Sequence, residues 1–291
     1  MKIIADRKDP LTRDAVCALG GFDGVHRGHQ AVIAEAKKIA QTKGRVGVIT
    51  FTPLPGSVLK SGPILYLTTD KEKEAILEQL ELDFLYYFSF SAEFARREPR
   101  EFVQMIADRI VPSAVIVGKN FHFGHGRIGT AEILAKLAGN LFTVRIQPAL
   151  NDDGVISSTR IRELLLLGNV RAADRLLGRP YSITGPVVAG KKIGQKLGFP
   201  TLNVQPAPEK LLPLDGVYRG NVNWTGCSHA GAVFCGHHLI EVHILDFIGD
   251  LYGCSVTIEF LDRLRGVEKF PDEAALRKAI AADVAKVREN G

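Results

Sequence analysis

Residues 15–40 read AVCALGGFDGVHRGHQAVIAEAKKIA, and this segment indicates the architecture of the first half of the chain. The apolar run at 15–19 is typical of a buried strand, and a glycine-bearing turn follows it at once. After the turn, apolar residues recur at helical spacing over about 30–40, and Gly44 can end that helix. A strand, a glycine turn and a helix in this order predict one unit of a parallel sheet covered by helices.

The same alternation of strand and helix continues to about residue 146. Strand-like runs occupy 46–51, 84–88, 115–117 and 142–146, and helices are predicted near 98–110 and 130–137. Thr69 and Glu72 form a capping box ahead of a further helix that runs to about Leu80. We therefore expect an α/β, Rossmann-like parallel sheet with helices on both faces, a fold that binds ligands beyond the carboxyl ends of its strands.

The pattern changes near Gly178-Arg179-Pro180, after two helical stretches at about 158–167 and 170–177. Short β-rich segments then follow, at 187–188, 201–204, 218–224, 230–234, 239–245 and 254–261. Closely spaced strands with glycine and proline turns predict a small antiparallel β-barrel, and a final helix spans about 272–288 with Asp272 as its cap. Two domains are expected, with boundaries 1–180 and 181–291.

The composition is that of an ordinary globular protein, with 46% hydrophobic and 24% charged residues. The net charge of +5 favours anionic ligands only weakly, and basic residues do not gather with aromatic ones as they do in nucleic-acid binders. No nucleic-acid partner is therefore expected. The apolar runs are too short to span a bilayer, and residues 1–9 lack the apolar core of a secretory signal, so we expect no membrane partner and a cytoplasmic protein.

The four cysteines are far apart and show no metal-binding spacing. They are Cys17, Cys227, Cys235 and Cys254. We interpret them as reduced structural thiols rather than metal ligands.

The turn at 20–29, GGFDGVHRGH, joins the first predicted strand to the first predicted helix. Its glycines let backbone amides approach an anion closely, and the helix N-terminus adds partial positive charge, so a polyphosphate is the expected occupant. His26 and His29, with Gly28 between them, can both direct ring N–H groups at phosphate oxygens. The alternative is a glycine turn that carries two surface histidines.

This turn resembles the HxGH signature of nucleotidyltransferases, and more closely the GxFDGVHxGH form of bacterial FAD synthetases. Two further segments match in the same order. The segment GKNFHFG at 118–124 resembles the family's GxNFxFG loop, which lines the flavin site, and ISSTRIR at 156–162 resembles its ISSTxxR motif, which closes over the ATP phosphates. Hydroxyl groups at a helix start with an arginine one turn later also suit a phosphate clamp on physical grounds, although Ser158 and Thr159 can equally cap the helix.

The resemblance implies that the FMN phosphate attacks the α-phosphorus of ATP and releases pyrophosphate, with Mg²⁺ as cofactor. It assigns ATP binding to Gly20, Phe22, Asp23, Gly28, Ser158 and Thr159, flavin binding to Asn120 and Phe121, and catalysis to His26, His29 and Arg162. One departure is clear, because residues 51–55 read FTPLP where the family has FxPHP. Leu54 therefore replaces a customary histidine, and we expect altered or slower adenylylation.

The segment at 185–203, GPVVAGKKIGQKLGFPTLN, resembles the glycine-spaced loop and GFPTAN motif of riboflavin kinases. The loop glycines, which would let the chain fold over ATP, are Gly190, Gly194 and Gly198. Thr201 and Asn203 alternate along a predicted strand and so project to one face, where their oxygens can hold Mg²⁺ and the phosphates. The alternative is a flexible hairpin with a buried threonine.

The run LIEVHILDF at 239–247, followed by DLYG at 250–253, resembles the family's EVHLLDF and DLYG segments. The alternating spacing alone supports two roles of Glu241 equally, a catalytic carboxylate and a solvated carboxylate on an outer strand face. The resemblance assigns Glu241 as the catalytic base that accepts the proton of the riboflavin 5′-hydroxyl. The family carries a longer loop with a Pro-Thr pair before this strand, and we interpret His237 and His238 as remnants of it rather than as metal ligands.

Together the two resemblances cover nearly the whole chain and imply a bifunctional riboflavin kinase/FMN adenylyltransferase. Riboflavin, FMN and ATP are the implied substrates, FMN and FAD the products, and a weak homo-oligomer is compatible with the sequence. One alternative is an FAD synthetase whose kinase has decayed with the short loop. Another is a flavin- or nucleotide-binding regulator without turnover, although binding alone would not require the carboxylate of Glu241.

Overall fold

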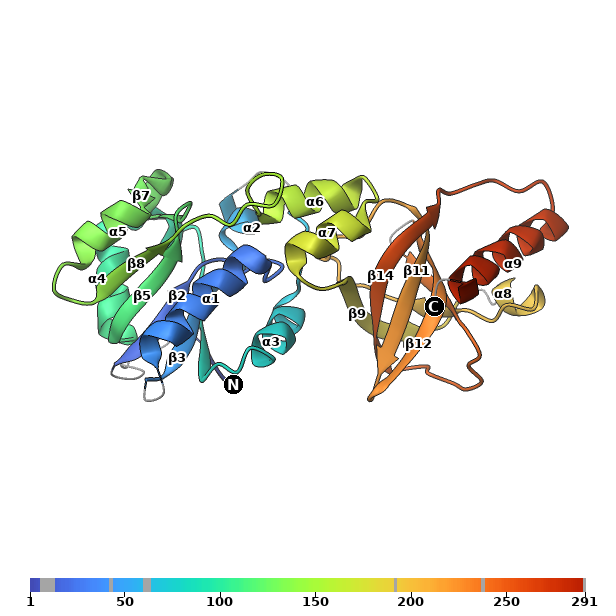
Figure 1. Cartoon of the computed structure of the whole chain (residues 1–291), viewed down its shortest axis with the longest axis horizontal. Coiled ribbons are helices and arrows are strands. Elements are labelled where there is room, and N and C mark those ends of the chain that lie inside the picture. Colours follow the sequence, from blue (N-terminus) through green and yellow to red (C-terminus); the bar gives the residue numbers. More distant parts are fainter. Residues whose placement is uncertain (6–13, 42–43, 60–63, 191–192, 237–238, 290–291) are drawn as a thin grey trace. The chain divides into compact units, whose positions relative to one another are not determined.

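The computed structural model describes residues 1–5, 14–41, 44–59, 64–190, 193–236 and 239–289. The chain divides into two compact units, Met1–Ser158 and Thr159–Gly291 (Figure 1). Contacts rather than independent folding define these units, so the domain boundary predicted at residue 180 stays a prediction.

The first unit is built on a six-stranded sheet in the order β1-β4-β3-β2-β5-β8. Its strands are β1 (Lys2–Ile4), β2 (Ala15–Leu19), β3 (Val46–Thr52), β4 (Phe84–Ser89), β5 (Pro112–Gly118) and β8 (Thr143–Gln147). Every pairing between them is parallel, which confirms the predicted sheet. From β2 the chain adds β3 and β4 on one side and then β5 and β8 on the other. The strand order therefore reverses at β2, where doubly wound sheets bind ligands.

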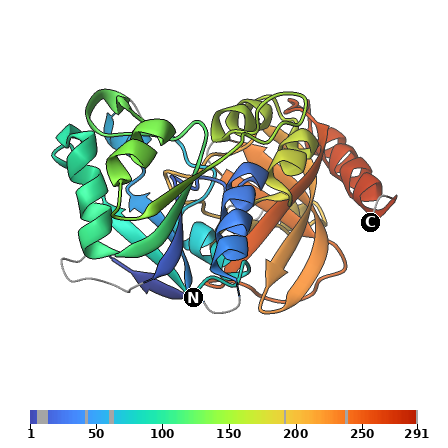
Figure 2. The same ribbon diagram turned by 60° about the vertical axis from the view of Figure 1, so that its left-hand side comes forward.

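Helices cover both faces of this sheet, as predicted (Figure 2). They are α1 (Arg27–Ala40) and α3 (Asp70–Glu78) on one face and α4 (Pro99–Arg109) and α5 (Ala131–Ala138) on the other. In β2, Val16 and Ala18 pack against α1, whereas Cys17 and Leu19 face the core shared with α4 and α5. Burial from both sides explains why the strand reads as an unbroken apolar run.

Short elements connect these layers in the first unit. They are α2 (Pro55–Leu59), η1 (Phe94–Arg96), β6 (His122–Phe123), η2 (His125–Arg127) and β7 (Gly129–Thr130). The predicted capping box is present at the start of α3, where Thr69 accepts from the Glu72 N–H and the Glu72 carboxylate accepts from the Thr69 N–H.

The second unit contains a closed antiparallel barrel in the order β10-β13-β12-β11-β14-β9, which confirms the predicted barrel. The strands are β9 (Tyr181–Val188), β10 (Leu202–Val204), β11 (Gly216–Trp224), β12 (Cys227–Gly236), β13 (Leu239–Ile244) and β14 (Ser255–Arg265). Each strand pairs with a neighbour on both sides, so the barrel leaves no open sheet edge.

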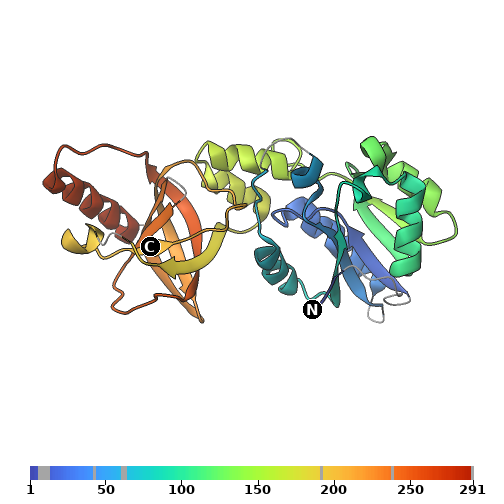
Figure 3. The ribbon, with the colours of Figure 1, turned by 180° about the vertical axis from the view of Figure 1, so that it is seen from behind.

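Among the described residues, four helices belong to this part of the chain. They are α6 (Ser158–Leu166), α7 (Val170–Leu177), α8 (Ile193–Lys196) and α9 (Glu273–Glu289). Figure 3 shows α9 lying beside the barrel. Arg265 of β14 donates to both carboxylate oxygens of Asp283 at 2.8 to 3.0 Å, and Asp272 accepts from the Ala275 N–H as the predicted cap. Asp283 is almost fully buried, so this forked contact ties α9 firmly to the barrel.

Asp174 of α7 gives the second unit a predictable response to pH. Burial raises the pKa of Asp174 to about 7, and the nearby Glu259 carboxylate adds to this rise. The Tyr181 N–H, which donates to Asp174, and the Arg179 cation act in the opposite direction and lower the pKa. Between about pH 4 and pH 7 the unfolded chain carries an ionised Asp174, whereas the folded unit keeps it protonated. The stability of the second unit should therefore fall as the pH rises through this window.

Asp174→Asn should remove most of that pH dependence, because asparagine keeps the acceptor for Tyr181 without the charge. Trp224, the one tryptophan of the chain, lies in β11, so denaturant unfolding followed by its fluorescence reports on the barrel. Asp262→Asn, which loses an exposed pair with Arg171, is the matched control and should keep the wild-type pH dependence. An unchanged pH dependence in the Asp174 variant would contradict the assignment.

Candidate active sites

The glycine turn predicted to bind polyphosphate follows the carboxyl end of β2, at the point where the strand order reverses. The Gly20 N–H donates to the Ile49 carbonyl at 3.1 Å, and the Thr50 hydroxyl donates to the Gly21 carbonyl at 3.1 Å. Phe22, Gly24 and Val25 have φ values of 50°, 80° and 41°. Left-handed backbone at three positions turns the chain sharply from the strand into α1.

The two histidines stack on each other at the N-terminus of α1. Their ring centroids are 3.6 Å apart with an interplanar angle of 16°, and the Phe22 ring is tilted against His29. His26 is buried and caps the helix, because its Nδ1 accepts from the His29 N–H at 3.3 Å. Neutral His26 therefore carries its proton on Nε2, the nitrogen that can donate to a ligand. His26 is therefore a buried cap, whereas His29 is half-buried.

Gly28 leaves room for the His26 ring of the stacked pair. A Cβ at this position would lie 3.1 Å from two atoms of the His26 ring and 3.7 Å from the Ile156 carbonyl oxygen. At Gly20 a Cβ would lie 3.3 Å from the Phe22 ring. The glycines thus allow aromatic rings to lie directly against the turn.

Asp23 fastens the turn to two distant segments. Its Oδ1 accepts from the N–H groups of Leu67 and Thr68 at 2.9 and 3.2 Å, and the Gly24 N–H donates to the Thr68 hydroxyl. Its carbonyl accepts from the Ser158 hydroxyl at 2.9 Å. Asp23 and Phe22 are both buried, and their contact with ATP stays a prediction.

The remaining ATP residues lie on α6. Thr159 is exposed, and Arg162 is half-buried about one turn after Ser158. Their predicted contacts with the ATP phosphates are not tested by the fold.

The predicted flavin residues lie just after the carboxyl end of β5, the neighbour of β2. Phe121 stacks on Phe123, with centroids 5.7 Å apart, and packs against the core under α4 and α5. Asn120 is exposed, and its carbonyl oxygen is 2.9 Å from Nδ1 of His122. The glycine turn and the flavin segment therefore leave adjacent strands at the same edge of the sheet.

Leu54 lies over the glycine turn, after the carboxyl end of β3. A Cβ on Gly21 would be 3.7 Å from Leu54 Cδ2, so an apolar side chain borders the turn here. Asp70 accepts from the Thr52 hydroxyl at 2.6 Å and from the buried Lys73 ammonium at 3.0 Å. The Thr52–Asp70–Lys73 contacts fix the start of the segment that carries Leu54. Sequence reasoning missed them, and only the capping box beside them gave a signal.

The predicted kinase residues meet in the barrel. In the strand register Asn203 of β10 is paired with Glu241 of β13, so the two side chains share one face. Asn203 is buried, and Glu241 is partly exposed. Thr201 lies immediately before β10 rather than on it, because that strand begins at Leu202.

The loop glycines have steric reasons of their own. A Cβ on Gly190 would lie 2.0 Å from Asn203 Nδ2, and one on Gly194 would lie 3.1 Å from the Thr201 hydroxyl and 2.4 Å from a backbone oxygen. Gly198 has a φ of 87°, in the left-handed region. Because these glycines have no side chains, the loop backbone can lie close to Thr201 and Asn203.

His243 holds the end of this loop, a contact that the sequence did not indicate. Its Nδ1 is 2.8 Å from the Pro200 carbonyl oxygen, and the Phe199 ring meets its ring edge-on at 5.5 Å. Because His243 and Glu241 alternate along β13, the strand that presents the carboxylate also anchors the loop. The predicted loop remnants, His237 and His238, lie outside the described residues.

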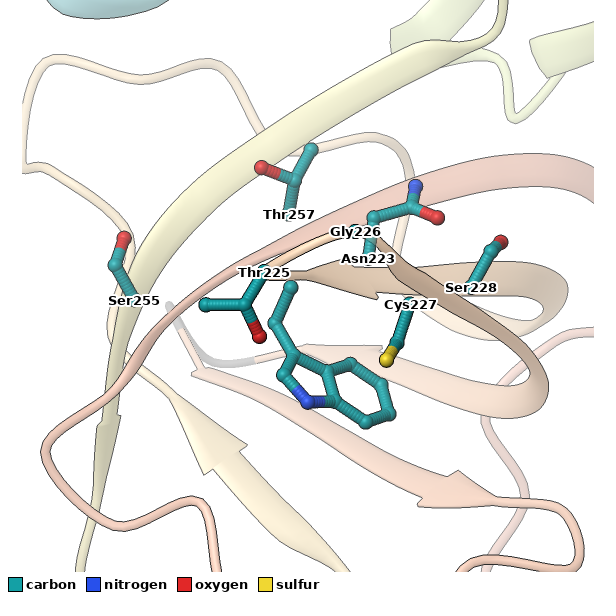
Figure 4. Close-up of a pocket in the computed structure, with 8 residues that line it drawn as sticks. Asn223, Thr225, Gly226, Cys227, Ser228, Ser255 and Thr257 are labelled. Carbon is teal, nitrogen blue, oxygen red and sulfur yellow. The ribbon is translucent and has the colours of Figure 1, made fainter.

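A separate hollow of about 480 Å³ lies at the β11–β12 turn (Figure 4). It is lined by Asn223, Trp224, Thr225, Gly226, Cys227, Ser228, Ser255 and Thr257. The predicted kinase residues are not part of this lining. Among the described residues no cluster of three or more His, Cys, Asp and Glu is arranged for a metal ion. Nor does any helix in the described ranges combine the length and apolarity needed to cross a membrane.

The chain matches the FAD synthetase family over residues 8–160 and the riboflavin kinase family over residues 177–290. Fold and matches together define a nucleotidyltransferase unit joined to a kinase barrel. The bifunctional riboflavin kinase/FMN adenylyltransferase of Listeria monocytogenes is 36% identical over 282 residues, which are 90% of this chain and 89% of that protein. The chain belongs to this bifunctional family.

Two further relatives extend the likeness over almost the full length. The bifunctional riboflavin kinase/FMN adenylyltransferase of Pseudomonas fluorescens is 35% identical over 292 residues, 96% of this chain and 94% of that protein. A crystal structure from Streptococcus pneumoniae, titled a macrolide-efflux protein, superposes with a TM-score of 0.91 at 31% identity over 99% of both chains. The presence of both folds in one chain is thus shared with a solved structure.

Gly190→Ala should impair the kinase site alone. The new Cβ would displace the Asn203 carboxamide from which it lies 2.0 Å, and roughly a tenfold loss of riboflavin phosphorylation is expected from the misplaced group. FMN and FAD formation are measured separately by chromatography, and FAD formation from supplied FMN should be unchanged. A wild-type rate of riboflavin phosphorylation in a folded variant would show that the close approach is not needed.

Proposed function

We propose that this chain converts riboflavin to FAD in two ATP-dependent steps, with phosphorylation at the barrel and adenylylation at the glycine turn. The observation that carries the proposal is the presence of two separate polar sites, the stacked His26–His29 pair and the Asn203–Glu241 pair, each bordered by glycines that admit close approach. The domains proposed for the two steps are residues 1–180 for adenylylation and 181–291 for phosphorylation.

At the adenylylation site the chain's contribution is alignment and charge stabilisation. The N-terminus of α1 and the ring N–H groups of His26 and His29 would hold the ATP phosphates, while Gly20 and Gly28 keep side chains out of the way. Ser158, Thr159 and Arg162 would close on the phosphates from the start of α6. The flavin would lie beside Asn120 and Phe121, so that the FMN phosphate faces the α-phosphorus of ATP.

At the kinase site Glu241 would accept the proton of the riboflavin 5′-hydroxyl as that oxygen attacks the γ-phosphorus of ATP. The loop carrying Gly190, Gly194 and Gly198 would cover the triphosphate. The hydroxyl of Thr201 and the carboxamide of Asn203 are hard oxygen donors beneath this loop, so they suit Mg²⁺. A bound Mg²⁺ would supply neutralisation of the phosphate charge.

The remaining assignments extend this proposal. The protein would work in the cytoplasm on small-molecule substrates, without nucleic acid, and a weak homo-oligomer is compatible with it. The two alternatives, a decayed kinase and a regulator without turnover, are less well supported because the models of both enzyme families match the chain, over residues 8–160 and 177–290.

His29→Ala tests the adenylylation site. Loss of one half of the stacked pair should lower FAD formation from FMN by about 10²–10³-fold, the usual effect of removing a charge-stabilising donor. Riboflavin phosphorylation by the same preparation should be unchanged and serves as the control. An undiminished FAD yield would remove His29 from the chemistry.

Glu241→Gln tests the kinase site. Glutamine keeps the shape but cannot take the hydroxyl proton, so FMN formation from riboflavin should fall by about 10²–10⁴-fold. FAD formation from supplied FMN should remain at the wild-type rate. If FMN formation persists, the base lies elsewhere; if the wild type itself makes FAD only from supplied FMN, the decayed-kinase alternative is correct.

A further inference from the structure

The segment that leads into α6 is folded into a compact turn over residues 150–156. Asn151 and Val155 form an antiparallel bridge, and the Asp152 N–H donates to the Gly154 carbonyl at 2.9 Å. The Ile156 N–H donates to the Leu150 carbonyl at 3.0 Å and closes the turn. This 150–156 turn is joined through Ser157 to Ser158, the first residue of the proposed phosphate clamp.

The 150–156 turn is tied to the start of α1. Arg27, the first residue of that helix, donates from Nη1 to Asp152 Oδ2 at 2.7 Å. The Ser158 hydroxyl donates to the Asp23 carbonyl at 2.9 Å, just beyond the other end of the turn. A Cβ on Gly28 would lie 3.7 Å from the Ile156 carbonyl oxygen, so the start of α1 also lies close to the last residue of the turn. Neither Arg27 nor Asp152 was singled out by the sequence.

The position of Arg27 is unfavourable for the helix itself. A cation in the first turn opposes the helix dipole, and α1 has no acidic residue in its first turn to compensate. Asp152 supplies the compensating charge from 125 residues away in the sequence. The pair therefore couples the fold of the helix start to the position of the 150–156 turn.

We propose that Arg27 and Asp152 are positioning residues for ATP in adenylyl transfer. Their ion pair holds the 150–156 turn against the start of α1, so that Ser158 is in place before the nucleotide binds. This inference rests on the proposed assignment of ATP to the glycine turn. Without the tie, binding of ATP would also have to order the segment, so the loss falls on ATP binding rather than on the chemical step.

The test is the steady-state kinetics of FMN adenylylation at varied ATP. Asp152→Asn and Arg27→Gln should each raise KM for ATP about two- to fivefold, with kcat within twofold of wild type. This modest range is set by the exposure of the pair, 41% for the Arg27 side chain and 30% for that of Asp152. The double variant should be no worse than either single variant, because both remove the same interaction. High salt should raise the wild-type KM toward that of the variants.

Two controls accompany these variants. Lys37→Gln loses the 3.7 Å pair with Glu81 near the other end of α1 and should leave KM for ATP unchanged. Riboflavin phosphorylation should also be unchanged in every variant. Arg27→Lys, which keeps the charge, should restore most of the wild-type KM.

Three outcomes would overturn the inference. If Arg27→Gln raises KM while Asp152→Asn lowers it or leaves it unchanged, Arg27 contacts the triphosphate directly. If the two effects add in the double variant, the residues act separately. A loss confined to kcat would also contradict a positioning role. Failure of the underlying site assignment is recognised separately, by a His29→Ala variant that retains FAD formation.

Discussion

The close approach of a polar side chain to a glycine backbone is the constraint on which both sites depend. At the first site the His26 ring lies where a Cβ of Gly28 would come within 3.1 Å, and at the second the Asn203 carboxamide lies where a Cβ of Gly190 would come within 2.0 Å. The two contacts occur in unrelated folds, one at a strand-to-helix turn and one over a barrel strand. In each case the absence of a side chain on glycine lets the backbone border a polar site closely.

The two folds supply different supports for these contacts. In the parallel sheet the support comes from strand order, because reversal at β2 brings the ends of β3, β2 and β5 to one edge. In the barrel it comes from register, because pairing of β10 with β13 sets Asn203 opposite Glu241. Closure fixes that register, since every strand is bonded on both sides. The two matched families of this bifunctional chain thus correspond to two different scaffolds, a parallel sheet and a closed barrel.

Much of the fold could be predicted from the sequence because strands and helices have local patterns of apolar residues. The apolar run of β2 and the helix at Val170–Leu177 are examples. The start of β9 was missed by six residues, from 187 to 181, because Gly185-Pro186 interrupts an otherwise alternating strand. Contacts across long separations left no local signal. Asp23 with Thr68 and Arg27 with Asp152 join residues 45 and 125 positions apart, and only the packed structure selects such partners.

The short strand β1 protects a vulnerable part of the first unit. Lys2, Ile3 and Ile4 pair with Phe84–Tyr86 of β4, whose sequence is FLYYFS, and so cover the first half of its outer side. A form of the protein lacking its first five residues would present this aromatic strand as an open edge, a template for addition of strands from other molecules. Trimming or proteolysis at the N-terminus would thus threaten solubility although it removes no part of either site.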